Sequence, residues 1–251
     1  MLANDKILLE VCCGTYQDVV TAKAAGADRI ELNCALELGG LTPSRGVFLK
    51  SLELGIPLAV MVRPHTSSFT YSEADFETML IDAKWFAENG AAGIVFGILN
   101  QDGTIDEARS LEMINVIRDV EAIYHKAFDL TPNLPQALEV LIRLGVKRVL
   151  TGGGPGPVGD NILALKGLHS RYGHLIELLP GGGVNPNNVV DILSETKIKQ
   201  IHMSAKHQIT QTITYPSHHK TKSVEQSYTA VSLDNLLEMI DIINQGENLY
   251  D

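Results

Sequence analysis

The chain has 251 residues, of which 45% are hydrophobic and 20% charged, a balance typical of a folded globular protein. Its formal net charge of −10 argues against a nucleic-acid surface, and no apolar run approaches the roughly 18 residues of a membrane span. Three cysteines, an odd number, favour reduced thiols in the cytoplasm over a disulfide framework, and the N-terminus lacks the basic start of a signal peptide.

Eight short apolar runs recur along the chain at a spacing close to thirty residues, and helical patterns lie between them. The runs cover residues 7–13, 29–34, 58–64, 93–99, 123–129, 148–153, 175–180 and 201–205. Capping residues predict helix starts at Ser72 and Thr104, and Pro135 suits the first turn of another helix. The repeat predicts an α/β fold, a single-domain (β/α)8 TIM barrel over residues 1–251. A doubly wound sheet is the alternative, but no GxGxxG motif follows the first run.

Residues 206–230 depart from this repeat. They are polar, show no clear period, and separate the eighth apolar run from the final helical pattern. We expect a long loop at the mouth of the barrel, where insertions usually fall.

Side chains alternate across a strand, so each run has one face toward the helices and one toward the barrel axis. This parity predicts an inward polar set of Glu10, Cys12, Glu31, Asn33, Arg63, His125, Asp129, His202 and Ser204. Burying a carboxylate costs several kcal/mol unless it is paired, and Arg63 is the expected countercharge for Glu10 and Glu31. Lys126 is expected to face the helix layer. An internal ion-pair network is the alternative explanation for the two glutamates.

The inward residues near the mouth suggest a catalytic site. His125 or Asp129 would move a proton while Arg63 stabilises negative charge, and Glu10 and Glu31 are further candidates. The substrate would be a small anionic metabolite that carries a phosphate or carboxylate group.

Two glycine-rich segments follow the sixth and seventh runs. Their backbone N–H groups can approach an anion closely, and late strand–helix loops of barrels often bind phosphate. Tight turning alone is the alternative explanation. The predicted ligand-binding residues are Gly152, Gly153, Gly154, Gly181, Gly182, Gly183 and Ser204.

The segments "LLEVCC", "GADRIELN", "LGGLTPSRG", "VMVRP", "GIVFGILNQDGTID", "YHKAFD", "RVLTGG", "LPGGGV" and "IHMSA" together resemble the CutC family of copper-homeostasis proteins. They run in order from about residue 7 to 205. The resemblance implies a cytoplasmic TIM barrel, often a homo-oligomer. It also implies Cu(I) binding through cysteines at the ends of the first two strands, and hence a copper ion as partner.

The first of these cysteine positions corresponds to Cys12, and the second falls, in family members with "RIELC", on Asn33. Cys34 is displaced by one residue, which reverses the face of the strand on which it lies. Cu(I) prefers soft ligands, so Cys12 with Met61 or His202 is the candidate metal site. Alternatively, the cysteine is a small buried apolar residue and the methionine fills a gap.

Overall fold

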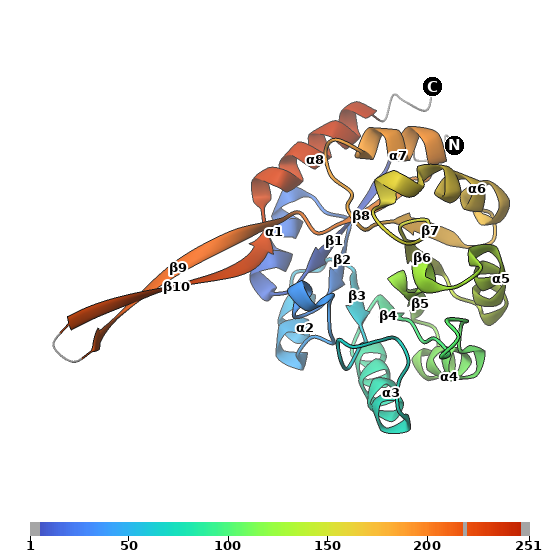
Figure 1. The fold of residues 1–251 in the computed structure, drawn as a ribbon, viewed down its shortest axis with the longest axis horizontal. Coiled ribbons are helices and arrows are strands. Elements are labelled where there is room, and N and C mark those ends of the chain that lie inside the picture. The colour runs from blue at the N-terminus through green and yellow to red at the C-terminus, as the bar shows by residue number, and fades with distance from the viewer. Residues whose placement is uncertain (1–5, 218–219, 247–251) are drawn as a thin grey trace.

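The computed structural model describes residues 6–217 and 220–246. Eight short parallel strands ring a central axis and helices surround them, as Figure 1 shows. The strands are β1 (Leu8–Cys13), β2 (Arg29–Leu32), β3 (Leu58–Met61), β4 (Gly93–Phe96), β5 (Glu121–Tyr124), β6 (Arg148–Thr151), β7 (Glu177–Pro180) and β8 (Gln200–Met203). The predicted (β/α)8 barrel is therefore confirmed.

A helix follows each of the strands β1 to β7, and the last helix follows β8 after residues 206–231. The helices are α1 (Tyr16–Ala25), α2 (Arg45–Leu52), α3 (Glu73–Glu88), α4 (Glu107–Ile117), α5 (Leu134–Leu144), α6 (Ile162–Tyr172), α7 (Val189–Thr196) and α8 (Leu233–Gly246), with short 3₁₀ turns η1 (Leu36–Leu38), η2 (Lys126–Leu130) and η3 (Val158–Asn161). Within residues 6–217 and 220–246, no helix combines the length and apolar character needed to cross a bilayer.

The barrel closes where β7 meets β8. Main-chain pairing runs in the order β7-β6-β5-β4-β3-β2-β1-β8, and β7 and β8 lie beside each other at its two ends. The side chain of Gln200 on β8 donates to the carbonyl oxygen of Leu178 on β7 at 3.2 Å. Side-chain hydrogen bonds thus contribute to closure at this seam.

The alternation of strand residues is as predicted. The outward set Val11, Cys13, Ile30, Leu32, Val60, Val62, Tyr124 and Ile201 belongs to the large apolar core between strands and helices. A separate small cluster inside the barrel contains Ala59, Met61, Val95 and Ile123. The sequence period of two therefore separates the helix-facing core from the barrel interior.

Two of the three helix starts predicted from sequence are confirmed. Ser72 caps α3 by accepting from the Asp75 amide at 3.1 Å, and Pro135 lies in the first turn of α5. The prediction for Thr104 is wrong. Asp106 caps α4, while the Thr104 hydroxyl donates to Asp102 in the preceding turn.

Strand β5 is shorter than its apolar run. It ends at Tyr124, because His125 takes an extended cap conformation and its Nδ1 accepts from the Ala127 amide at 3.1 Å. The chain then turns into η2 instead of continuing as a strand to residue 129. After this turn strand parity no longer holds: Lys126 lines the central cavity and Ala127 lies in the outer core.

The expected loop at 206–230 is instead a β-hairpin. Strands β9 (Lys206–Ser217) and β10 (Lys220–Val231) pair antiparallel and leave the barrel as a long two-stranded arm (Figure 1). Threonine, isoleucine and tyrosine are frequent in this segment, and such residues favour strands. The polar composition concealed this signal.

Gly97, directly after β4, leaves the space that the His125 ring fills: a Cβ at this position would overlap the ring. We expect Gly97→Ala to lower the free energy of unfolding by about 1–3 kcal/mol, as overpacking does. Gly167→Ala is the control. Its Cβ would meet nothing within 4 Å on an exposed helix face, so it should raise stability by about 0.5–1 kcal/mol. Denaturant titration of both variants checks the pair, and a neutral Gly97→Ala would contradict the packing described.

Candidate functional site

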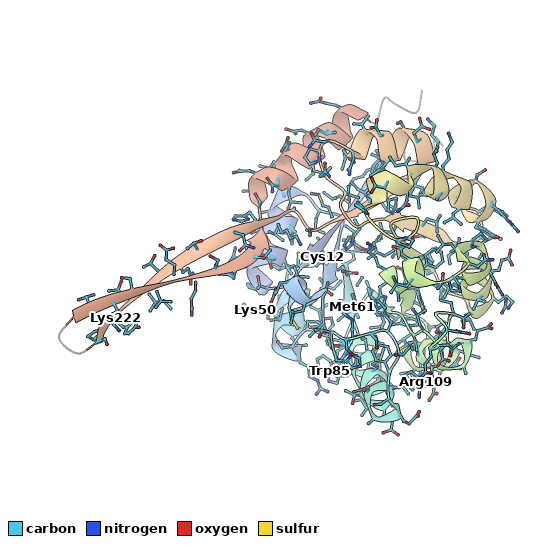
Figure 2. All side chains as sticks on the ribbon, viewed as in Figure 1. Cys12, Lys50, Met61, Trp85, Arg109 and Lys222 are labelled. Atoms are coloured by element: carbon cyan, nitrogen blue, oxygen red, sulfur yellow. The ribbon has the colours of Figure 1, made fainter. Side chains whose placement is uncertain are left out.

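A cavity of about 400 Å³ opens at the carboxyl ends of the strands, where barrel proteins build their sites. Figure 2 shows Cys12 and Met61 near the centre of the barrel, far from Lys222 on the hairpin. The candidate residues that line the cavity are Cys12, Glu31, Met61, Arg63, His125, Gly182, Gly183, His202 and Ser204. Those that do not line it are Glu10, Asp129, Gly152, Gly153, Gly154 and Gly181.

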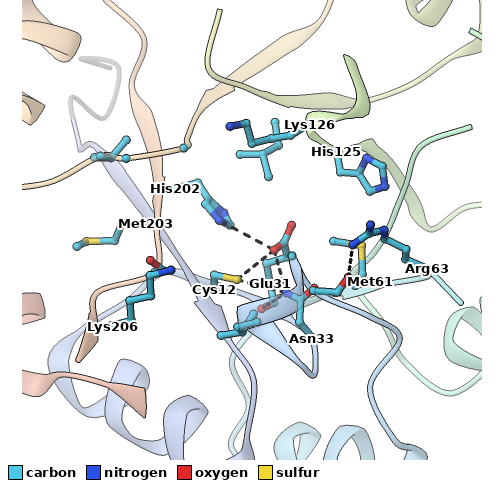
Figure 3. Close-up of a pocket in the computed structure, with 18 of the residues that line it drawn as sticks. Cys12, Glu31, Asn33, Met61, Arg63, His125, Lys126, His202, Met203 and Lys206 are labelled. Atoms are coloured by element: carbon cyan, nitrogen blue, oxygen red, sulfur yellow. Dashed lines mark hydrogen bonds and ion pairs between the residues drawn. The ribbon is translucent and has the colours of Figure 1, made fainter. Parts of the chain in front are cut away.

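Three potential metal ligands converge on one wall of this cavity, from β1, β2 and β8. Ligand atoms of Cys12, Glu31 and His202 all lie within 4.8 Å of one another. The Cys12 thiol donates to Glu31 Oε2 at 3.4 Å, and His202 Nε2 lies 4.0 Å from that oxygen (Figure 3). They meet because β1 pairs with both β2 and β8, with Cys12 in register with Glu31 and Glu10 with His202.

Asn33 borders this cluster. Its side-chain amide donates to Glu31 Oε2 at 2.9 Å and to Cys12 Sγ at 3.4 Å. Its Oδ1 is buried and has no hydrogen-bond partner among the residues that the structure describes. Asn33, which the sequence resemblance aligned with a second cysteine position, therefore contacts Cys12.

Glu10 lies beneath His202 and orients it. Glu10 Oε1 is 2.8 Å from His202 Nδ1, and Arg29 Nε forms an ion pair with Oε2. Burial would raise the pKa of Glu10, but His202 and Arg29 outweigh it and lower the pKa to about 2. Burial would likewise lower the pKa of His202, yet the charges of Glu31 and Glu10 raise it. The bound Nδ1 leaves Nε2 facing Glu31.

The prediction that Arg63 is the countercharge of the glutamates is wrong. Its guanidinium donates to the carbonyl oxygens of Gly40 at 3.1 Å and Thr66 at 2.9 Å, and lies 5.0 Å from the Phe69 ring centre. Arg63 thus holds two loops at the mouth. Its Nε is buried without a partner in the described part of the chain.

His125 lies close to Arg63, with its ring centre 4.8 Å from that of Phe69. Burial, helped by the Arg63 charge, lowers the pKa of His125 to about 3. The ring is therefore neutral at pH 7. Because Nδ1 accepts from the Ala127 amide, the proton resides on Nε2, which has no partner within residues 6–217 and 220–246.

Asp129 lies in η2, and its side chain contacts the glycine loop after β6. Its carboxylate accepts from the amides of Gly152 at 2.9 Å and Gly154 at 3.2 Å, and from the Thr151 hydroxyl. The Gly153 amide donates to Thr151 Oγ1 at 2.8 Å. The N–H groups of Gly152 and Gly154 therefore bind a carboxylate of the protein itself, and that of Gly153 binds a hydroxyl group.

Lys126 reaches the cavity, whereas the sequence predicted that it faces the helices. A Cβ on Gly182 would overlap its ammonium group, so the lysine side chain passes directly over that glycine. Gly182 and Gly183 both have positive φ values, of 91° and 98°, which favour glycine. Sequence parity missed Lys126 because η2 turns the chain after β5.

The other two cysteines point elsewhere. Cys13 is buried in the outer core, and the Cys34 thiol donates to the Thr42 carbonyl oxygen at 3.1 Å beside a different hollow. Cys12 is therefore the cysteine of the central cavity, as parity predicted.

Fold and site together define a TIM-barrel protein with a candidate metal-binding cavity at the carboxyl ends of its strands. Residues 7–207 match the model of the CutC family, and the chain belongs to this family. It is 42% identical over 200 residues to a CutC family protein of Treponema denticola, covering 79% of this chain and 81% of that one. It is 36% identical over 205 residues to the human copper homeostasis protein cutC homolog, covering 81% and 75%.

A solved structure supports the same assignment. The crystal structure of the CutC protein from Streptococcus agalactiae superposes with a TM-score of 0.75 at 31% sequence identity. The match covers 78% of this chain and 97% of that one.

The low pKa of His125 predicts acid sensitivity. Its folded-state value of about 3 lies below the ordinary 6.5, so its contribution is complete above pH 6.5 and is lost as the pH falls toward 3. Between pH 7 and pH 5 this loss is about 2 kcal/mol in the free energy of unfolding. We expect His125→Gln to show a correspondingly shallower decline in urea titrations at these pH values. Parallel declines for the two proteins would contradict the assignment.

Proposed function

We propose that this protein binds copper in the central cavity, with Cys12, Glu31 and His202 as ligands, and acts in copper homeostasis. The observation that carries the proposal is the convergence of the three ligand atoms within 4.8 Å. The names of the human and streptococcal relatives, which refer to copper homeostasis, support the choice of metal.

The donor set fits copper chemistry. A thiolate is a soft ligand that selects Cu(I), and imidazole suits copper as well. Met61 also lines the cavity and offers a thioether, a second soft group. The carboxylate of Glu10 behind His202 is the outer partner that metal-bound histidines usually have.

Binding requires the Cys12 thiol to lose its proton. Burial and the neighbouring Glu31 raise the pKa of this thiol well above its ordinary value, so the free protein holds it protonated. Burial also raises the pKa of Glu31, which accepts the thiol hydrogen bond. Because Glu31 is itself a proposed ligand, the proton that an incoming ion displaces from Cys12 leaves through the open cavity to the solvent.

The geometry supports copper binding better than the catalytic alternative. Asp129 is bound by the loop amides of Gly152 and Gly154, and Arg63 is engaged by backbone carbonyls. Glu10 lies beneath the cavity. Lys126, Gly182, Gly183 and Ser204 also line the cavity, and we assign to them the anionic group of any small ligand that accompanies the ion.

Replacing the central thiol tests the site. We expect Cys12→Ser to weaken Cu(I) binding about a hundredfold in a competition titration against a chromophoric chelator, because the softest ligand is lost. Cys34→Ser is the matched control, since it removes a thiol outside the cavity and should leave the affinity unchanged. Equal affinities of wild type and Cys12→Ser would exclude the proposed site.

A second thiol at position 33, aligned with the family's other cysteine, should strengthen Cu(I) binding. Asn33 Nδ2 lies 3.4 Å from Cys12 Sγ, so Asn33→Cys would place two sulfur atoms close enough to share one ion. We expect at least about a tenfold gain in Cu(I) affinity, measured in the same titration. Unchanged or weaker binding would show that the ion does not lie between positions 12 and 33.

A further inference from the structure

The central cavity carries positive charge in a strongly acidic protein. Arg63, Lys126 and Lys206 line it, and Glu31 is the one carboxylate among the described residues that do so. Three cations against one carboxylate give a formal charge of +2 with histidines counted as neutral, whereas the whole chain carries −10. Figure 3 shows these cationic side chains around the same hollow as Cys12. A cavity of this sign attracts anions, although the molecule as a whole repels them.

Lys126 has donors to spare. The Arg63 guanidinium already donates to backbone carbonyl oxygens of two loops, so it contributes charge more than hydrogen bonds. Lys126 Nζ lies 3.9 Å from Asp129 Oδ2, beyond hydrogen-bond distance, and that carboxylate is already bound by loop amides. The ammonium group of Lys126 therefore keeps its N–H donors for a ligand.

The segment after β7 supplies further donors beside this lysine. A Cβ on Gly182 would overlap Lys126 Nζ, so the ammonium group lies directly against this glycine. Gly182, Gly183 and Val184 all line the cavity, and their amide groups have no hydrogen-bond acceptor within residues 6–217 and 220–246. Backbone amides of a folded protein are obligatory donors and rarely stay unpaired. These three are therefore available to an anion in the cavity.

Ser204 adds a hydroxyl group from the segment after β8. It lines the same cavity, and its side chain makes no hydrogen bond to any residue in the described ranges. Strands β7 and β8 are neighbours, so the segments that follow them lie on the same side of the cavity. Barrel proteins often bind phosphate groups with the loops after the seventh and eighth strands.

The number of donors favours a phosphate group over a carboxylate. Lys126, the three amides and the Ser204 hydroxyl are five donor groups from three separate segments. A phosphate monoester offers three strong acceptor oxygens and a charge of about −1.5 to −2 at pH 7, whereas a carboxylate has two oxygens and a single charge. The cavity volume of about 400 Å³ is typical of small-molecule sites and leaves room for an organic group on the phosphate.

We propose that Lys126, Ser204 and the amides of residues 182–184 bind the phosphate group of a small phosphate monoester, whose organic part occupies the rest of the cavity. The proposal goes beyond copper binding and does not rest on it, because none of these groups is a proposed copper ligand.

Isothermal titration calorimetry of the full, metal-free chain with glycerol 3-phosphate tests the proposal. We expect saturable binding with a Kd below about 1 mM. Lys126→Met keeps an unbranched side chain but removes the ammonium group, and should raise the Kd at least about tenfold. The control is Lys166→Met on α6, which removes an equally charged group that pairs with Glu195 outside the cavity, and should leave the Kd within about twofold. Acetate should bind at least about tenfold more weakly than glycerol 3-phosphate.

No saturable binding up to about 10 mM glycerol 3-phosphate, or equal Kd values for the two lysine variants, would overturn the proposal. Equal affinities for acetate and glycerol 3-phosphate would overturn the choice of phosphate. Because the protein is metal-free, failure here is distinguishable from failure of the Cu(I) titration. Far-UV circular dichroism establishes that each variant is folded. Ser204→Ala, which should raise the Kd at least about threefold, repeats the comparison should Lys126→Met unfold.

Discussion

The buried carboxylate of Glu10 is the interaction on which the cavity depends. It is held between Arg29 and His202, and burying such a charge costs several kcal/mol unless it is paired. The pairing fixes the rotamer of His202, and so the wall formed with Cys12 and Glu31. Arg29 also reaches Gln200, which bonds to β7 across the closing seam. One ion pair thus joins the barrel's closure to the orientation of the candidate ligands.

Most of the barrel could be predicted from the sequence, because alternation with a period of two is a strong local signal. It placed Val11 and Cys13 toward the helices and Cys12 toward the axis, as observed. The strand ends could not be predicted in this way. The run "IYHKAFD" is apolar enough to continue as a strand, and the hydrogen bond from the Ala127 amide to His125 that ends it is a single local contact. Because this strand end was missed, the direction of the Lys126 side chain was also predicted wrongly.

Partners were harder to predict than positions. Parity identified the inward charges but not which of them meet, since pairing depends on the register between strands distant in sequence. Glu10 is in register with both Arg29 and His202, and Arg29 lies at the very start of its strand. Similarly, the glycines after β6 looked like an anion site, and they do bind a carboxylate, but it is that of Asp129. The hairpin was missed because polar residues, many of them with hydroxyl groups, lie between its few apolar residues. The segment as a whole therefore has a polar composition.

The small cluster of Ala59, Met61, Val95 and Ile123 determines whether a ligand can pass through the barrel. Together with the charged layer around Glu10 and Arg29, it fills the interior beneath the cavity. A ligand therefore enters and leaves the cavity through the same opening. Such a cavity suits the reversible binding and release of a ligand at a single opening. It excludes a channel that carries a ligand from one end of the barrel to the other.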